Sequence, residues 1–188
     1  NDVYTFSTQA ELKTLWDAGG IDTIDLSNQN VAANLNLTEG TFSDIGQRQM
    51  IYDGPLSQAQ DNIAIAFGVV IENAIGTRFA DTLVGNQADN LITGGAGDDQ
   101  IDGGAGFDTL RVDGLRSSYN VTKNAQGLVT IEGPDGQDHL QSIEQVTFND
   151  GTFTLASIFS AMETVVPTQS SDVDLLPGEQ ETAYFLLE

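Results

Sequence analysis

The sequence predicts an all-β protein: a parallel β-roll with flanking antiparallel strands and a short N-terminal helix. Three observations indicate this class. A nine-residue unit is repeated four times between residues 76 and 111. The segment 112–155 alternates strand-like runs with turn sequences, and residues 8–16 have the pattern of a short helix. A fixed period of this kind is typical of stacked repeats, so it takes precedence over other signals.

The four units share Gly at position one, Asp or Asn at position six and an aliphatic residue at position eight. They are GTRFADTLV (76–84), GNQADNLIT (85–93), GGAGDDQID (94–102) and GGAGFDTLR (103–111). Six residues of each unit are expected to turn and three to extend, with the eighth side chain facing a core. The core residues would be Leu83, Ile92, Ile101 and Leu110. Two units would complete one coil, so loops two units apart would lie above one another.

Stacked loops of this composition would gather oxygen atoms. Glycine permits the positive φ that points carbonyls inward, and position six adds a carboxylate or amide oxygen. Calcium takes this mixture of ligands, whereas softer metals prefer imidazole or thiolate. We therefore pair Asp81 with Asp99 on one side of the roll. Asn90 is paired with Asp108 on the other.

The pattern G-G-x-G-x-D-x-U-x resembles the nonapeptide of calcium-binding RTX proteins. The ligands that it predicts are Gly76, Arg78, Asp81, Gly85, Gln87, Asn90, Gly94, Gly95, Ala96, Gly97, Asp99, Gly103, Gly104, Ala105, Gly106 and Asp108. The glycine-rich runs match neither the dinucleotide nor the GK[ST] phosphate motif. Units one and two have Thr77, Phe79, Asn86 and Ala88 where glycine is expected. A non-glycine residue at positive φ costs about 1 kcal/mol, so these two loops are expected to take another conformation.

Residues 16–111 resemble the C-terminal domain of the serralysin-type secreted metalloproteases. The phrases that carry the resemblance are WDAGGIDTIDLS (16–27), LNLTEGTFSDIG (35–46), GVVIENAIG (68–76), NQADNLITGGAGDD (86–99) and GGAGFDTL (103–110). The resemblance implies a calcium-binding module attached to an N-terminal catalytic domain and exported by type I secretion. In all, about three to five Ca²⁺ ions are expected.

The resemblance also implies further ligands upstream of the repeats. The carboxylates of Asp17 and Asp22 with the Gly19 carbonyl would hold one ion. A second would be held by Asp22, Glu72 and the carbonyls of Gly20 and Val70. The family's upstream Arg-x-Gly-x-Thr ligand segment is not found before Trp16. The alternative is a glycine-rich turn with solvated acids.

The segments outside the repeats divide the chain. Thr8 and Glu11 have capping-box spacing at the start of the expected helix 8–16. Residues 47–62 are polar with a Gly-Pro turn, which predicts an exposed loop, and 63–67 alternate as a strand. We divide the chain into a roll domain, 1–155, with parts 16–75, 76–111 and 112–155, and an acidic tail, 156–188.

The segment after the repeats is expected to cap the open end of the roll. Strands are predicted at 119–122, 128–131 and 146–148, with Phe153 and Leu155 continuing the last hairpin. Within the tail, 156–163 reads as a short helix. The acidic, apolar end of the tail resembles an uncleaved type I secretion signal. A helix or strand docked on the roll is the alternative.

Composition excludes several functions. The chain has 28 acidic and 6 basic residues and a formal charge of −22, which disfavours nucleic acid as a partner. It has no Cys, so no disulfide or thiolate site is available. No apolar run reaches ~18 residues, so no membrane span is expected. The opening NDVYTFSTQ is typical of a fragment of a longer protein rather than of a signal peptide.

A zinc protease site would need several histidines, and the chain contains only His139. No G-x-S-x-G motif accompanies that histidine, so we expect no catalytic site in this chain. Two hypotheses remain. The first is a secreted module that folds on calcium and supports an attached exported enzyme, most simply a zinc metalloprotease. The second is an interaction module that binds a polysaccharide, a partner protein or a cell surface, for which the 47–62 loop is the main sequence hint.

Overall fold

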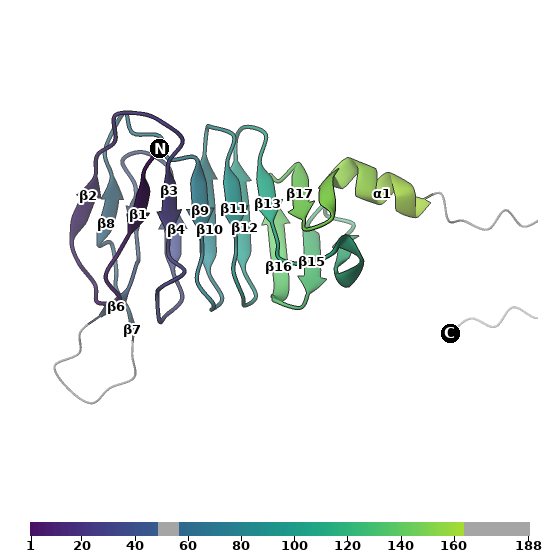
Figure 1. The fold of residues 1–188 in the computed structure, drawn as a ribbon, viewed down its shortest axis with the longest axis horizontal. Coiled ribbons are helices and arrows are strands. Elements are labelled where there is room, and N and C mark those ends of the chain that lie inside the picture. The colour runs from purple at the N-terminus through teal and green to yellow at the C-terminus, as the bar shows by residue number, and fades with distance from the viewer. Residues whose placement is uncertain (49–56, 164–188) are drawn as a thin grey trace, which may run out of the picture.

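A computed structural model describes residues 1–48 and 57–163. Two main sheets face each other, and their coils stack along the length of the molecule (Figure 1). The seven-stranded sheet consists, in order, of β1 (Val3–Thr5), β3 (Thr23–Asp25), β9 (Asn73–Ile75), β11 (Leu91–Thr93), β13 (Thr109–Arg111), β17 (Gln145–Phe148) and β18 (Gly151–Thr154). The six-stranded sheet consists, in order, of β14 (Asn120–Lys123), β15 (Val129–Gly133), β16 (Gly136–Gln141), β12 (Gln100–Gly104), β10 (Thr82–Asn86) and β4 (Asn34–Asn36).

Each repeat strand pairs in parallel with the strand two units further along the chain. Leu83 of β10 lies opposite Ile101 of β12. Ile92 of β11 lies opposite Leu110 of β13. This register confirms that two units complete one coil. It confirms the all-β parallel roll as well.

The side chains at position eight of the repeats, together with the residues that pair with them in neighbouring strands, form two buried rows. One row lies on the inner face of each sheet. All nine have exposed fractions of 2% or less. The rows are Leu35, Leu83, Ile101 and Leu140 in one sheet, and Ile24, Ala74, Ile92, Leu110 and Val146 in the other. Burying one large aliphatic side chain contributes about 1.5–3 kcal/mol. The rows therefore hold the two sheets together and fix the register of the loops between strands.

The expected helix at 8–16 is wrong. Strand β2 (Lys13–Leu15) occupies this segment and pairs in parallel with β8 (Ile63–Ile65). Leu15 is buried and Trp16 is 74% exposed, as the alternation of a strand requires. An isolated helix of this length is marginal, and pairing with a distant strand satisfies the backbone and buries Leu15. Tertiary contacts thus override the local helix signal.

The N-terminal end of the roll carries a separate three-stranded sheet in the order β2-β8-β5, with β5 at Phe42–Ser43. The strand expected at 63–67 is confirmed by β8. Within the expected loop 47–62, β6 (Gln47–Arg48) pairs antiparallel with β7 (Ser57–Gln58). The rest of that loop, 49–56, lies outside the described residues.

The antiparallel strands after the repeats extend both sheets. β16 joins the meander β14-β15-β16 to β12 in parallel, and β17 joins the hairpin β17-β18 to β13 in parallel. The three strands predicted at 119–122, 128–131 and 146–148 are confirmed with small shifts. β16 was not predicted. The cap therefore continues the coils of the roll as well as closing its end.

The C-terminal described element is helix α1 (Leu155–Glu163), which confirms the helix predicted at 156–163. Leu155 begins the helix instead of extending the hairpin. A 3-10 turn at Arg116–Ser118 precedes β14. The tail beyond α1, 164–188, lies outside the described residues. Among the described helices, none is long and apolar enough to cross a membrane.

Candidate metal centre

Acidic side chains form a ladder along one side of the roll. The backbone amide of Asp81 donates a hydrogen bond of 2.8 Å to Oδ1 of Asp99. The amide of Asp99 donates one of 3.0 Å to Oδ1 of Asp138, and the amide of Ala33 donates one of 2.7 Å to Oδ1 of Asp81. We call each acidic or amide side chain of a ladder a rung. The structure places the predicted pair Asp81 and Asp99 on adjacent rungs, and it adds Asp138 as a further rung.

A second ladder runs along the other side. The amide of Asn90 donates to Oδ1 of Asp108, and the amide of Asp108 donates to Oε2 of Glu144, both at 2.8 Å. The side-chain amide of Asn90 also donates to the carbonyl of Glu72 at 3.0 Å. The predicted pair Asn90 and Asp108 therefore lies on adjacent rungs too. Glu144 extends this ladder into the cap.

Several rungs are buried without enough hydrogen-bond partners. Asp22, Asp99 and Asp108 have exposed fractions of 0%, 0% and 1%. The Oδ2 atom of each accepts no hydrogen bond from the described residues. Burying an unpaired carboxylate costs several kcal/mol, because the lost hydration is not replaced. These three oxygen atoms therefore require a cation or a proton.

The pKa values of the ladder carboxyls are raised because these groups are buried with too few hydrogen-bond donors. Burial raises the pKa of Asp99 to about 7 and that of Asp138 to about 6, and neighbouring carboxylates add to both shifts. Burial also raises the pKa of Asp81 and of Asp108. Negative charge in these ladders is thus unfavourable unless a counter-cation neutralises it.

The loops of units three and four are open and require glycine. Gly95 and Gly97 have φ of +105° and +119°, and Gly104 and Gly106 have +90° and +131°. A Cβ atom on Gly97 would lie 2.6 Å from the backbone carbonyl carbon of Phe79 in the preceding coil. Other residue types would therefore be strained and would clash. This close approach stacks the backbone carbonyls of successive loops.

The loops of units one and two close on themselves through side chains. The amide of Thr77 donates to Oδ2 of Asp81 at 2.6 Å, and the amide of Phe79 donates to Oγ1 of Thr77 at 3.0 Å. In unit two the amide of Asn86 donates to Oδ1 of Asn90 at 2.8 Å. The non-glycine residues of these loops have no positive φ. The expectation of another conformation is confirmed.

The predicted backbone ligands at positions one and three recur in all four loops, and those at positions two and four belong to units three and four only. Position one is buried, and a Cβ atom on Gly76 or Gly85 would overlap the carbonyl oxygen of the corresponding glycine in the next coil. Position three carries exposed side chains. The residues at position one are Gly76, Gly85, Gly94 and Gly103, and those at position three are Arg78, Gln87, Ala96 and Ala105. Carbonyl oxygens therefore line the space beside the rung carboxylates.

The first N-terminal site predicted from the resemblance gathers three carboxylates. One oxygen atom from each of Asp2, Asp17 and Asp22 lies within 4.8 Å of the others. The amide of Gly19 donates to Oδ2 of Asp17 at 2.6 Å and lowers the pKa of that carboxyl. A Cβ atom on Gly20 would lie 3.0 Å from Oδ2 of Asp22. Asp2 was not among the predicted ligands of this site, and the structure adds its carboxylate to the cluster.

The second N-terminal site brings together Asp22 and Glu72. The amide of Asp22 donates to Oε2 of Glu72 at 2.8 Å, so the two residues are adjacent rungs of the second ladder. Val70 lies two residues before Glu72 in the loop between β8 and β9. Ligation through the carbonyls of Gly20 and Val70 remains a prediction.

Three acids of the site were missed in the sequence: Asp2, Asp138 and Glu144. A signal for two of them was present. Asp or Glu followed two residues later by an aliphatic residue occurs at 138–140 and 144–146, as it does at positions six to eight of the repeats. The pairing registers align these triplets with 99–101 and 108–110. No comparable pattern marks Asp2, which is positioned by the pairing of β1 with β3.

The donor set suits a hard divalent cation. Its atoms are carboxylate oxygens, an amide oxygen and backbone carbonyls, with no imidazole or thiolate among them. Calcium takes six to eight such oxygens and tolerates irregular geometry, whereas magnesium demands a strict octahedron. The unpartnered Oδ2 atoms of Asp99 and Asp108, together with the carbonyls of the glycine-rich loops beside them, therefore fit Ca²⁺.

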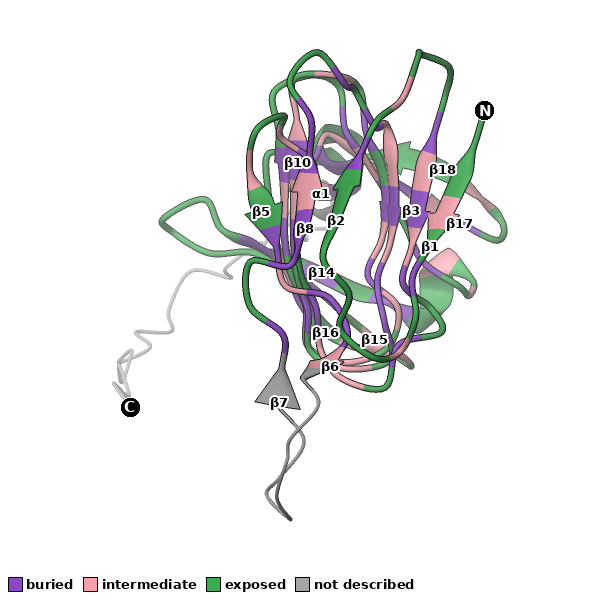
Figure 2. Cartoon of the chain, turned by 90° about the vertical axis from the view of Figure 1, so that its left-hand side faces the viewer, coloured by how far each residue is buried: buried purple, intermediate pink, exposed green. Residues whose placement is uncertain are grey.

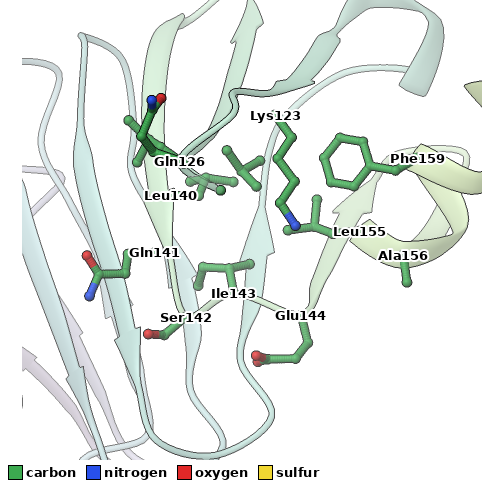
Figure 3. Close-up of a pocket in the computed structure, with 13 residues that line it drawn as sticks. Lys123, Gln126, Leu140, Gln141, Ser142, Ile143, Glu144, Leu155, Ala156 and Phe159 are labelled. Atoms are coloured by element: carbon green, nitrogen blue, oxygen red, sulfur yellow. The ribbon is translucent and has the colours of Figure 1, made fainter.

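A groove of about 520 Å³ lies between the cap and α1, and Glu144 of the second ladder is among the residues that line it. Figure 3 shows Leu140, Ile143, Leu155 and Phe159 on its walls, with Lys123 among them. It contains no histidine. Its walls combine apolar side chains with polar ones, among them Lys123 and Glu144, which suits binding of a ligand.

His139 lies on β16, where its ring hydrogen-bonds with the hydroxyl of Thr130 at 3.2 Å. The preceding Asp138 points into the first ladder, as its bond to the Asp99 amide requires. Successive strand residues face opposite sides of a sheet, so these two side chains diverge. They do not form a catalytic pair.

Comparison with known proteins places these features in a family context. The model for the Peptidase M10 serralysin C terminal matches residues 2–150. Serralysin C of Dickeya chrysanthemi is 48% identical over 85 residues, which is 44% of this chain and 15% of that protein. Serralysin G of the same organism is 42% identical over 90 residues, 45% of this chain and 17% of that protein. Serralysin of Photorhabdus laumondii is 44% identical over 91 residues, 47% of this chain and 17% of that protein. The matched region thus spans less than a fifth of these relatives.

Proposed function

This chain belongs to the Peptidase M10 serralysin C-terminal family, and from that premise we propose that it is a calcium-binding module of an exported protease. The module folds when Ca²⁺ enters its stacked loops, and it stabilises the enzyme to which it is attached. The matched family is the C-terminal part of serralysins, so the chemistry of the protease belongs to another part of the parent protein.

One observation carries the proposal. The two ladders bury the carboxylates of Asp99 and Asp108 with one oxygen atom of each unpartnered, beside loops whose glycines allow close stacking of carbonyls. These buried charges destabilise the fold unless they bind something, because packing of the apolar core does not require them. A divalent cation would offset their charge and complete their coordination.

The gain in stability from calcium is large on the scale of a domain. A site with Kd of about 0.1 mM contributes about 1.4 kcal/mol at ~1 mM calcium. Four sites would contribute about 5–6 kcal/mol, which is comparable with the net stability of many domains. Calcium is therefore a condition for folding.

The same linkage suits type I secretion to the extracellular medium. Where calcium is scarce, the mutual repulsion of the acidic residues favours an extended chain that an export channel accepts. Outside the cell, millimolar calcium closes the loops. The tail 156–188 would carry the export signal.

The partner in the parent protein would be its N-terminal catalytic domain. Exposed apolar side chains gather around the three-stranded sheet at the N-terminal end, where Figure 2 shows exposed residues on β2 and β5. They are Leu12, Trp16, Phe42 and Phe67. An apolar patch of this kind marks an interaction surface. The gene upstream of Asn1 should encode H-E-x-x-H-x-x-G-x-x-H, and a different upstream domain would contradict the protease parent.

Circular dichroism tests calcium-dependent folding. The chain in excess EGTA should lack the β-sheet spectrum, and addition of about 1 mM calcium should restore it. Magnesium at the same concentration is the control and should have little effect, because the irregular oxygen sites do not fit its octahedral geometry. A full β-sheet spectrum in EGTA would contradict the proposal.

A second candidate function is binding of a polysaccharide or a protein partner. The groove beside α1 favours it, because Lys123 lies beside the apolar side chains of Leu155 and Phe159 in a concave surface. Binding that persists at saturating calcium and is lost on Phe159→Ser would support this function. Binding that does not change in that variant would exclude the groove.

A further inference from the structure

The segment before and within β16 has the pattern of a repeat unit. Residues 133–141 read GPDGQDHLQ, with Gly133 at position one, Gly136 at position four, Asp138 at position six and Leu140 at position eight. β16 pairs in parallel with β12, so its eighth position continues the core row of the six-stranded sheet. The segment therefore takes the place of the next unit on this side of the roll, although β14 and β15 separate it from the array.

The segment 133–138 is the tight turn between β15 and β16 with the strand ends on either side, and it stacks on unit three at its fourth position. The amide of Gly97 donates to the carbonyl of Asp135 at 2.8 Å. Gly136 has φ of +144°, and a Cβ atom on it would overlap the carbonyl oxygen of Gly97. Gly97 itself makes the corresponding approach to Phe79 one coil earlier. The residues at position four, Phe79, Gly97 and Gly136, therefore lie in close contact over three successive coils.

The space between the two loops carries negative charge and is open to a small ligand. The amide of Asp99 donates to Oδ1 of Asp138 at 3.0 Å, and Asp138 is only 6% exposed. Oδ2 of Asp99 is buried and accepts no hydrogen bond from the described residues. A cavity of about 430 Å³ beside these carboxylates is bounded by Gly94 and Gly95 on one side and by Pro134 and Asp138 on the other, and the charged residues Arg111, Asp113 and Asp135 also line it.

We propose that the loops 94–99 and 133–138 hold one further Ca²⁺ ion, with Asp99 and Asp138 as carboxylate ligands and loop carbonyls as the remaining ligands. This inference rests on the proposed function and extends it beyond the four contiguous units. The ion would tie the cap to the last coil on this side of the roll. Residues 133–138 therefore act as a displaced fifth unit.

Asp135 offers a matched control within the same loop. Its carboxylate accepts a hydrogen bond of 3.1 Å from the hydroxyl of Tyr119, and its backbone carbonyl accepts one from the amide of Gly97. Its charge also acts on Asp99 and Asp138, so this control separates loss of nearby charge from loss of a ladder carboxylate. Asp135→Asn and Asp138→Asn remove the same charge from the same loop. Only the second removes a carboxylate from the ladder.

Native mass spectrometry of the full chain in calcium counts the ions directly. Asp138→Asn should hold one ion fewer than the unmodified chain, and Asp135→Asn should hold the same number. An unchanged count in Asp138→Asn would overturn this inference and leave the proposed function standing. Equal loss in both variants would overturn it too, because charge rather than ligation would then explain the loss. No bound ion in the unmodified chain would overturn the proposed function itself.

A crystal of the unmodified chain grown in calcium gives a second measurement that does not depend on how the variants fold. Anomalous scattering should show a peak between the carboxylates of Asp99 and Asp138. Peaks beside Asp81 and Asp108 with none between Asp99 and Asp138 would overturn the inference alone.

Discussion

At the scale of single residues, equivalent positions in the repeats meet different surroundings. Asp81 and Asp99 both stand at position six of a unit. The two carboxylate oxygens of Asp81 accept hydrogen bonds from Thr77 and from the amide of Ala33. Oδ2 of Asp99 accepts none from the described residues. Replacement of each carboxylate by an amide should therefore have opposite effects on the calcium-free protein.

Asp99→Asn should stabilise the calcium-free chain at pH 8 and destabilise the calcium-loaded chain. The amide removes a buried negative charge but also removes a ligand, so each effect should amount to about 1–3 kcal/mol. Circular dichroism in EGTA measures the first effect as a gain of β-sheet signal over the unmodified chain, and urea unfolding in calcium measures the second. Asp81→Asn is the control and should destabilise the calcium-free chain, because its side-chain NH₂ would face a backbone donor. Destabilisation by Asp99→Asn in EGTA would contradict our interpretation.

Gly97→Ala should destabilise the calcium-loaded chain by about 2–4 kcal/mol, because strain at positive φ adds to the clash with Phe79. Gly127 provides the control. It has φ of +89°, but a Cβ atom there would meet only Lys123 at 3.8 Å. Gly127→Ala should cost about 1 kcal/mol from strain alone. Equal losses in the two variants, measured by thermal unfolding, would show that close stacking of the loops is unimportant.

At the scale of elements, the sequence predicts what is periodic or locally marked. The nine-residue period predicts the positions of β10 to β13 and the register in which they pair. Turn sequences mark the ends of β14 and β15. The segment 8–16 was misread because Leu12, Leu15 and Trp16 suit one side of a helix, whereas pairing with β8 is a contact between distant residues. Loop 133–138 was missed because its repeat pattern lies outside the array. Its role is visible only in the register of β16 against β12.

The strand assignment of β2 makes a direct prediction. Leu15 is 1% exposed and Trp16 is 74% exposed. Leu15→Ala should destabilise the chain by about 2–5 kcal/mol, whereas Trp16→Ala should change its stability by less than about 0.5 kcal/mol. In a helix that packs both side chains on one side, both substitutions would be costly. Similar large losses in chemical unfolding would therefore favour the helix over β2.

At the scale of the whole molecule, the two ladders distribute acidic groups along the full length of a chain with formal charge −22. Burial raises the pKa of Asp99 to about 7 and of Asp138 to about 6, well above the ~3.9 of an unfolded aspartate. Between those values the folded chain binds more protons than the unfolded chain. Without calcium, its stability should therefore fall as pH rises through this window.

Calcium should reverse that dependence, because cation and proton compete for the same oxygens. The calcium-free chain should be more stable at pH 4.5 than at pH 7.5, and the chain in saturating calcium should be less stable at pH 4.5 than at pH 7.5. Circular dichroism of the chain freed of calcium by a chelating resin measures its β-sheet content at both pH values, and urea unfolding measures the stability of the calcium-loaded chain. Asp138→Asn controls for general charge repulsion and should flatten the calcium-free slope, since it removes one titrating rung. A calcium-free chain whose stability rises with pH would show that the ladder carboxyls are paired by some group other than a divalent cation.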